Sequence, residues 1–162
     1  MFDLNPHYER EIRRLRKAVS DTPFTCDAGC SDCCTLHVWT WTEWLKVPPE
    51  LRREAIDASA RCPYATANGC QVYEYRPVIC RLHALGPIIG TVRDIESVSL
   101  CCQRGYVSPD PLSKKVARDI FLRYIALIHK EARDQANQGI EKPLFAGPFG
   151  RFAGQKRLSD AI

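Results

Sequence analysis

The amino-terminal segment has apolar residues at the spacing of an amphipathic helix. Asn5 and Pro6 are of the types that often cap and begin a helix. The apolar residues that follow lie three or four positions apart, at Tyr8, Ile12, Leu15 and Val19. This pattern predicts a helix from about Pro6 to Val19.

The opposite face of this predicted helix is basic. Its positive residues are again three and four positions apart, at Arg10, Arg13, Arg14 and Lys17. Glu9 and Glu11 interrupt the positive charge, and a charged helix face is usually solvated. We interpret this face as ordinary solvated surface, with an acidic protein or RNA as the alternative partner.

The longest helical pattern lies near the other end of the chain. Asp110 and Pro111 form a favourable helix start. One apolar stripe follows at helical spacing and is widened by its neighbours, at Leu112, Val116, Ala117, Ile120, Phe121, Tyr124, Leu127 and Ile128. The stripe predicts a core helix over residues 111–138.

Shorter elements are predicted between these two helices. Thr40 and Glu43 have the spacing of a capping box, which predicts a short helix at that point. Pro49 can open another helix that continues to about Ala60. Asn68-Gly69 predicts a turn, and residues 88–100 predict a small hairpin. The expected fold is mainly α, with about four helices and little β-structure.

The length of 162 residues fits one domain. We expect a single cysteine-cluster domain over residues 1–138, with its metal-binding part at 26–102, and an irregular tail at 139–162. No apolar run approaches the roughly 20 residues that a bilayer span needs. The first 17 residues contain acidic side chains and no apolar segment typical of a signal peptide. The sequence therefore predicts a cytoplasmic protein without a membrane helix.

Cysteine is the unusual component, with 9 of 162 residues. A secreted disulfide scaffold is typically short and has an even number of cysteines. This chain is longer than such scaffolds, and its number of cysteines is odd. In the reducing cytosol, clustered thiols are more often metal ligands or redox groups. The net charge of +4 is too small to indicate a nucleic-acid partner by itself.

The cysteines fall into two clusters and a trailing pair. All nine are candidate ligands: Cys26, Cys30, Cys33 and Cys34 in the first cluster, Cys62, Cys70 and Cys80 in the second, and Cys101 and Cys102 in the pair. Thiolate selects zinc, cuprous copper or iron-sulfur clusters. The long gaps in the second cluster are unlike those of zinc fingers and suit an iron-sulfur site better. The nine cysteines could form either one metal site or two.

Other side chains near the cysteines have candidate roles. Arg76 and Arg81 flank Cys80, where a guanidinium could stabilise a negatively charged cluster, the alternative being ion pairs with Glu74 or Asp94. His37 and His83 follow cysteines closely enough to act as ligands, although a core or solvated histidine is the more common case. The spacing of Cys30 and Cys33 also permits a dithiol reaction, but no βαβ pattern surrounds it.

The second cluster lies in a string of specific residues. Cys62-Pro63 and Asn68-Gly69-Cys70 are followed by the segment from Val72 to Arg81, which contains Tyr73, Arg76-Pro77 and Cys80-Arg81. Together with the first cluster, this string resembles the YkgJ-type CxxCxxCC family, described as zinc- or iron-chelating domains. One difference is the opening gap, in which three residues rather than two separate Cys26 and Cys30. The resemblance covers about residues 26–82 and implies a metal or iron-sulfur site built from these cysteines.

The sequence thus favours a metal-binding protein with an iron-sulfur cluster that serves electron transfer, sensing or an accessory role. The alternative is a structural zinc module that acts as a protein- or RNA-binding adaptor. No Ser-His-Asp grouping, paired-carboxylate motif or phosphate loop is visible, so whether the chain catalyses a reaction stays open.

Overall fold

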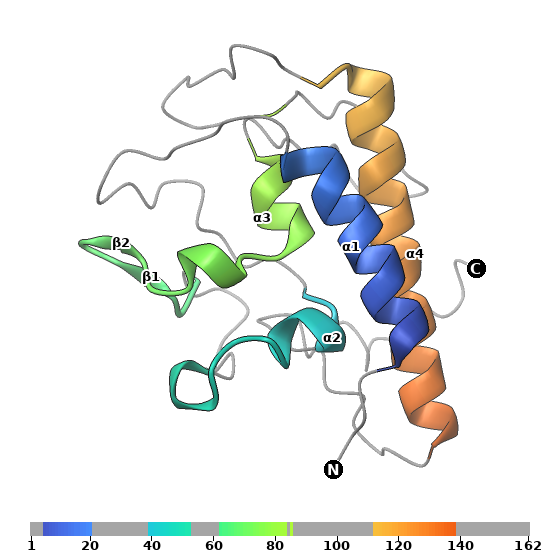
Figure 1. Cartoon of the computed structure of the whole chain (residues 1–162), viewed down its shortest axis with the longest axis horizontal. Helices are drawn as coiled ribbons and strands as arrows, with labels where there is room; N and C mark the ends of the chain where they lie inside the picture. Colours follow the sequence, from blue (N-terminus) through green and yellow to red (C-terminus); the bar gives the residue numbers. More distant parts are fainter. Residues whose placement is uncertain (1–4, 21–38, 53–61, 84, 86–111, 139–162) are drawn as a thin grey trace.

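A computed structural model describes residues 5–20, 39–52, 62–83, 85 and 112–138 (Figure 1). Within these ranges 67% of the residues are helical, with four α-helices and a two-stranded sheet, so the expected mainly α fold is confirmed. The predicted hairpin at 88–100 and the predicted tail at 139–162 lie outside the described residues.

Helix α1 spans Pro6–Ser20 and confirms the predicted amino-terminal helix. The side-chain oxygen of Asn5 accepts a hydrogen bond from the backbone N–H of His7 at 2.9 Å, as an N-cap residue does. The four apolar residues predicted to share one face, Tyr8, Ile12, Leu15 and Val19, are all buried. The apolar spacing therefore identified the correct face of this helix.

Helix α4 spans Lys114–Asn137 and begins later than the predicted start at Pro111. Ser113 caps it, because its hydroxyl accepts from the backbone N–H of Val116 at 3.3 Å. Val116 was predicted on the apolar stripe but is 45% exposed. Successive helical residues are rotated by about 100°, so a buried face centred on Tyr124 includes Ala117 and leaves Val116 outside.

Helix α2 spans only Trp41–Trp44, and Thr40 is its N-cap, as predicted. The hydroxyl of Thr40 accepts from the backbone N–H of Glu43 at 3.1 Å. The next predicted helix is present only as a 3-10 turn at Pro49–Leu51, after which Arg52 is extended. Residues 53–61, which would have continued this helix, lie outside the described residues.

Strands β1 (Ala65–Thr66) and β2 (Gly69–Cys70) form an antiparallel hairpin at the predicted Asn68-Gly69 turn. Gly69 has a φ of 101°, a left-handed value that glycine adopts without a steric penalty. A 3-10 turn at Tyr73–Tyr75 follows, and then helix α3, which spans Val78–Leu82. The sequence did not predict α3.

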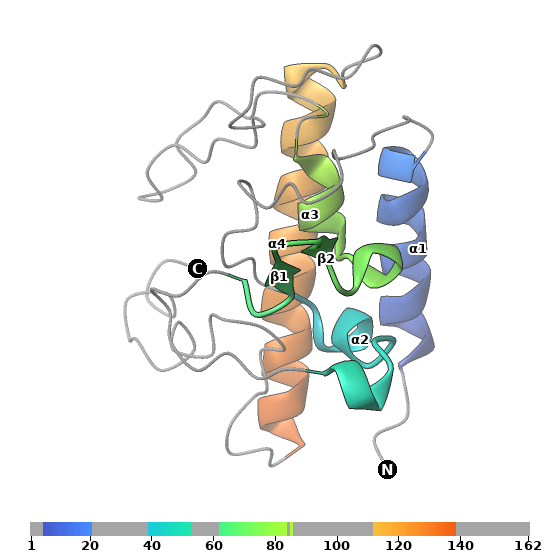
Figure 2. The same ribbon diagram turned by 90° about the vertical axis from the view of Figure 1, so that its left-hand side faces the viewer.

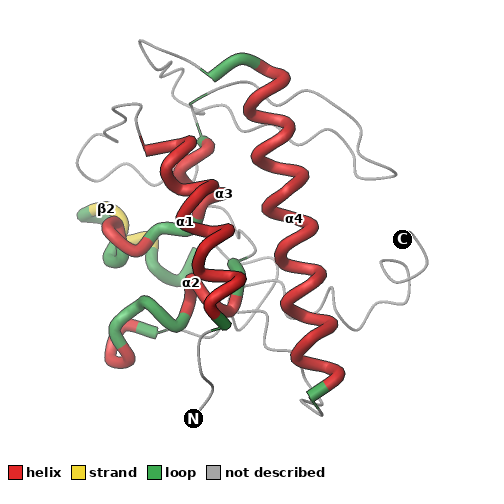
Figure 3. The backbone as a smooth tube through the Cα atoms, turned by 45° about the vertical axis from the view of Figure 1, so that its right-hand side comes forward, coloured by secondary structure: helices red, strands yellow, loops and turns green. Residues whose placement is uncertain are grey.

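Helices α1 and α4 run antiparallel to each other, as the sequence-ordered colours of Figure 2 show, and α4 is the longest of the described helices (Figure 3). Helix α3 lies beside the carboxyl-terminal half of α1, and α2 lies near the amino-terminal half (Figures 1 and 2). Apolar side chains of α1, α3 and α4 form a first core together with Leu85, and examples are Ile12, Leu82 and Phe121.

A second, smaller core is formed by residues that flank the hairpin and α2 in the sequence. It contains the buried residues Trp39, Val47, Tyr64 and Val72. Trp41 and Trp44 pack against it from α2, and their rings stack with centroids 4.7 Å apart. Among the helices that the structure describes, none has both the length and the apolar content for crossing a bilayer.

Candidate metal centre

Three of the nine predicted ligands lie in the described part of the chain, namely Cys62, Cys70 and Cys80. All three are partly buried. The other six candidates, Cys26, Cys30, Cys33, Cys34, Cys101 and Cys102, lie outside the described residues, as does His37. The structure therefore describes the second cysteine cluster only.

The β1–β2 hairpin brings Cys62 and Cys70 to the same side of the second core. Cys70 is paired across the sheet with Ala65, and the backbone N–H of Ala65 donates to the carbonyl of Cys62 at 2.9 Å. Both thiol residues pack against the second core. The tight turn at Gly69 thus reverses the chain so that two cysteines eight positions apart become neighbours.

Cys80 comes from a different element and a different core. It is the third residue of α3, and it packs against the first core. Pro77 precedes the helix in an extended conformation, with φ −67° and ψ 163°. This conformation turns the chain from the Tyr73–Tyr75 turn into α3, as expected for a residue whose ring fixes φ.

The three thiols influence one another electrostatically. Burial is the main cause that raises the pKa of Cys80 well above its ordinary value, and the nearby Cys62 and Cys70 thiols raise it further. Burial also raises the pKa of Cys62, and Cys70 adds to this effect. The charges of the two hairpin cysteines therefore act on Cys80, although Cys80 packs against the first core and they pack against the second.

Among the described residues alone, no group of three or more His, Cys, Asp or Glu side chains is arranged to hold a metal ion. His83 is buried, with 6% exposure, and belongs to no such group within that part of the chain. A complete site at this position would thus require ligands from the segments that contain the other six cysteines.

The two predicted arginines contact the backbone around Cys80. Arg76 lies over the ring of Tyr73 at 3.6 Å from the ring centroid, and its Nε donates to the Tyr73 carbonyl at 3.2 Å. Its positive charge lowers the pKa of Cys80, which partly offsets the effect of burial. The positive charge of Arg76 thus favours the thiolate form of Cys80, and its predicted role beside a bound cluster stays a prediction.

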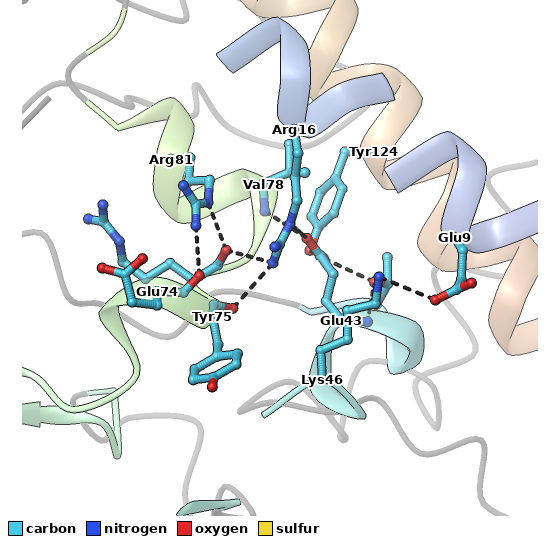
Figure 4. Close-up of polar contacts among 11 residues, drawn as sticks. Glu9, Arg16, Glu43, Lys46, Glu74, Tyr75, Val78, Arg81 and Tyr124 are labelled. Carbon is cyan, nitrogen blue, oxygen red and sulfur yellow. Dashed lines mark hydrogen bonds and ion pairs between the residues drawn. The ribbon is translucent and has the colours of Figure 1, made fainter. Parts of the chain in front are cut away.

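Arg81 donates hydrogen bonds to the backbone of the turn that precedes α3. Its Nε donates to the Arg76 carbonyl at 3.1 Å, and its Nη2 donates to the carbonyl of Glu74 at 2.9 Å (Figure 4). Burial lowers the pKa of Arg81, and the positive charges of Arg16 and Arg76 lower it further. The contact with Glu74 is thus to its backbone and not the side-chain ion pair considered above.

Sequence reasoning missed a buried carboxylate beside this site. Glu43 is completely buried, and its carboxylate accepts from the Tyr124 hydroxyl at 2.6 Å, the Thr40 hydroxyl at 3.0 Å and the backbone N–H of Val78 at 2.9 Å. The capping-box spacing identified Glu43 only as a partner of Thr40. Its partners in α3 and α4 are 35 and 81 residues away in the sequence, so no local sequence pattern indicates these contacts.

Arg16 was also missed. Its Nη2 donates to the carbonyls of Tyr75 at 3.4 Å and Arg76 at 3.0 Å, while its Nε lies 3.5 Å from the Glu43 carboxylate (Figure 4). The sequence pattern that could have indicated Arg16 is its place at the edge of the apolar face of α1. It comes four residues after buried Ile12 and one residue after buried Leu15.

The comparisons with known proteins add no relative to this description. Neither protein-family models, nor curated proteins, nor solved structures give a match to this chain.

Proposed function

We propose that this chain is a cytoplasmic metal-binding protein whose cysteines hold an iron-sulfur cluster for electron transfer, sensing or an accessory role. In this proposal Cys62, Cys70 and Cys80 are ligands, and the remaining ligands come from the cysteines at 26–34 and 101–102. The observation that supports the proposal is that three partly buried cysteines of one segment, two at a hairpin and one in α3, pack against the two cores, with the charges of Cys62 and Cys70 acting on Cys80.

The chemistry of these side chains supports a soft metal centre. Neighbouring buried thiols raise each other's pKa because their thiolates would repel one another in a medium of low polarity. A bound cation reverses this effect, since a coordinating thiol is deprotonated outright. The three cysteines thus form a group whose common deprotonation would be favourable with a metal and unfavourable without one.

The resemblance to the YkgJ-type cysteine-cluster family supports the same proposal from the sequence. Of the residues that carry it, the part from Cys62 to Arg81 forms one continuous described segment that contains Cys62, Cys70 and Cys80. The positive charge of Arg76 near Cys80 is suited to a cluster with excess negative charge. Arg76 is accordingly the outer-sphere residue that we propose for the cluster.

Anaerobic purification with metal and sulfide analysis tests this proposal. We expect a brown protein that contains iron and acid-labile sulfide, and we expect serine at position 62, 70 or 80 to reduce the iron content. The six cysteines outside the described residues, changed to serine one at a time, separate the remaining ligands from bystanders and provide matched controls. Protein that contains neither iron nor zinc after anaerobic purification would overturn the proposal.

Zinc bound by the same cysteines is the second candidate, and stoichiometric zinc in a colourless protein would favour it. In that case the exposed basic face of α1 would be the binding surface for a protein or RNA partner. Arg10 and Arg13 are exposed on this face, whereas Arg14 forms an ion pair with Glu11 at 2.6 Å. Reversal of Arg10, Arg13 and Arg14 to glutamate should then abolish partner binding while the zinc stays bound.

A further inference from the structure

The segment that leads into α3 is held by side chains from two other helices. Arg16 of α1 donates to the carbonyls of Tyr75 and Arg76, at 3.4 and 3.0 Å. Glu43 of α2 accepts from the backbone N–H of Val78, the first residue of α3, at 2.9 Å. The two side chains also contact each other, with 3.5 Å between Arg16 Nε and Glu43 Oε1 (Figure 4).

The contact between Glu43 and Val78 replaces an N-cap. The first N–H groups of any helix lack an acceptor within the helix, and a residue just before the helix often supplies one. Pro77 occupies that position here and has no side-chain hydrogen-bonding group. Glu43 supplies the acceptor from another element, so the start of α3 is attached to α2.

Helix α3 depends on such contacts because it has only 5 residues. Helices this short are not stable in isolation, and their position is set by the groups that surround them. Cys80 is the third residue of α3, so the position of its sulfur relative to Cys62 and Cys70 follows the position of the whole helix. Displacement of α3 would change the position of Cys80 relative to the two hairpin thiols.

We propose that Glu43 and Arg16 are positioning residues that fix α3 and thereby the position of Cys80 relative to the hairpin that carries Cys62 and Cys70. This proposal rests on the proposed metal centre for its biological meaning. The placement of Cys80 can nevertheless be measured without any metal, so the two proposals can fail separately.

The chain offers a matched control for each residue. Glu131 is a second buried carboxylate, with 5% exposure, and it accepts from the backbone N–H groups of Trp41 and Thr42 at 2.6 and 3.0 Å. It therefore holds α2 through hydrogen bonds that involve no residue of the segment at 73–82. Arg14 lies on the same helix as Arg16 but is exposed and pairs with Glu11. Glu131→Gln therefore controls for the loss of a buried carboxylate, and Arg14→Gln controls for the loss of a positive charge on α1.

The test measures the rate at which iodoacetamide alkylates Cys80 in the reduced, metal-free protein, with each cysteine resolved by peptide mass spectrometry. Glu43→Gln and Arg16→Gln should each accelerate alkylation of Cys80 by about 10-fold, because loss of a buried charged hydrogen bond increases the open population by that order. Cys62 should react at the wild-type rate. Glu131→Gln and Arg14→Gln should leave the reaction of Cys80 unchanged.

The two variants separate positioning from electrostatics. The Glu43 charge contributes to the raised pKa of Cys80, so its removal alone would increase the thiolate fraction and the rate. Removal of the positive charge of Arg16 would have the opposite electrostatic effect. Acceleration in both variants therefore indicates release of α3, whereas opposite changes, or rates equal to those of the controls, would overturn the proposal.

A second measurement connects positioning to the metal. Glu43→Gln protein purified anaerobically should bind metal about 10- to 100-fold more weakly than wild type, the usual effect of removing a group that orients a ligand. Glu131→Gln should retain wild-type affinity, and equal weakening in both variants would contradict a specific positioning role. If the wild-type protein itself contains no metal, the proposed function fails, and the alkylation rates alone decide the placement of Cys80.

Discussion

At the residue scale, the buried acidic side chains are the groups that connect the helices. Glu43 and Glu131 together accept hydrogen bonds from α2, α3 and α4, and both are almost inaccessible to water. A buried carboxylate is stable only when its oxygens are satisfied, and these two are satisfied by partners distant in sequence. Their carboxylates therefore fix how the helices are arranged.

Removal of the Tyr124 hydroxyl should destabilise the fold. Burial is the main cause that raises the pKa of Tyr124 well above its ordinary value, and Glu43 adds to it, so the hydroxyl keeps its proton and donates to Glu43. Hydrogen bonds to charged groups contribute about 1.5–3 kcal/mol, and we expect Tyr124→Phe to reduce the free energy of unfolding by that amount. Urea unfolding measures it.

Tyr75→Phe is the control for this substitution, because the Tyr75 side chain is 36% exposed and its contact with Arg16 uses the backbone carbonyl. It should change the free energy of unfolding by less than about 0.5 kcal/mol. Equal effects of the two substitutions would show that the Tyr124–Glu43 hydrogen bond contributes nothing specific.

Glu131 should make folding stability depend on pH in a definite direction. Burial is the largest cause that raises the pKa of Glu131, and the negative charge of Glu43 also raises it, while hydrogen bonds from Thr42 and Trp41 act in the opposite direction. A raised pKa means that the folded protein retains the proton after the unfolded chain has released it. Stability contributed by this group is therefore greatest at acidic pH and is lost as the pH rises through the folded pKa.

The measurement for Glu131 is the difference in the free energy of unfolding between wild type and Glu131→Gln, from about pH 4 to about pH 8. The advantage of wild type over the variant should decrease as the pH rises, because the variant cannot titrate at this position. An advantage that increases with pH would instead require a lowered pKa for Glu131.

At the element scale, sequence periodicity predicted long helices well and short elements poorly. Helix α1 and most of α4 were predicted because their apolar faces repeat over several turns. Helix α3 has 5 residues, too few to establish a period, and it is stabilised by contacts from α1 and α2 that are distant in sequence. The turn at Gly69 was predictable because the conformational requirement of a tight turn is local.

The division of α4 into a buried face and an exposed face provides a prediction at this scale. Ile120 lies in the first core with 4% exposure, whereas Val116, one turn earlier, is 45% exposed. We expect Ile120→Ala to reduce the free energy of unfolding by about 2–5 kcal/mol, because a buried side chain is lost and a cavity remains. Val116→Ala should change it by less than about 0.5 kcal/mol. Urea unfolding of both variants measures the values, and the reverse order would place Val116 on the buried face.

At the scale of the whole molecule, the candidate site lies where two unequal cores meet. The first core contains 14 buried residues of the described chain and the second contains four. The cysteine spacing in the sequence predicted Cys62, Cys70 and Cys80 as one group of ligands, and in the structure the charges of Cys62 and Cys70 act on Cys80. The sequence could not predict that Cys80 belongs to the first core and the hairpin cysteines to the second, because core membership depends on packing between distant elements.

The difference in size between the two cores predicts which part of the chain metal removal should destabilise. The hairpin has one pair of short strands and a small apolar core, so its own interactions are few, whereas α1 and α4 share the large first core. Regions with few buried apolar contacts open at low free energy, and metal binding contributes directly to the folding of the segments that supply its ligands. We therefore expect a chelator to increase amide hydrogen exchange at residues 62–72 by about 10-fold or more, while α1 and α4 keep their protection.

Hydrogen exchange with mass spectrometry, before and after chelation of the anaerobically purified protein, makes the comparison within one sample, with α1 and α4 as internal controls. Unchanged exchange in the hairpin after removal of bound metal would contradict its role as a ligand segment, and equal loss of protection in α1 and α4 would show that the two cores unfold as one cooperative unit.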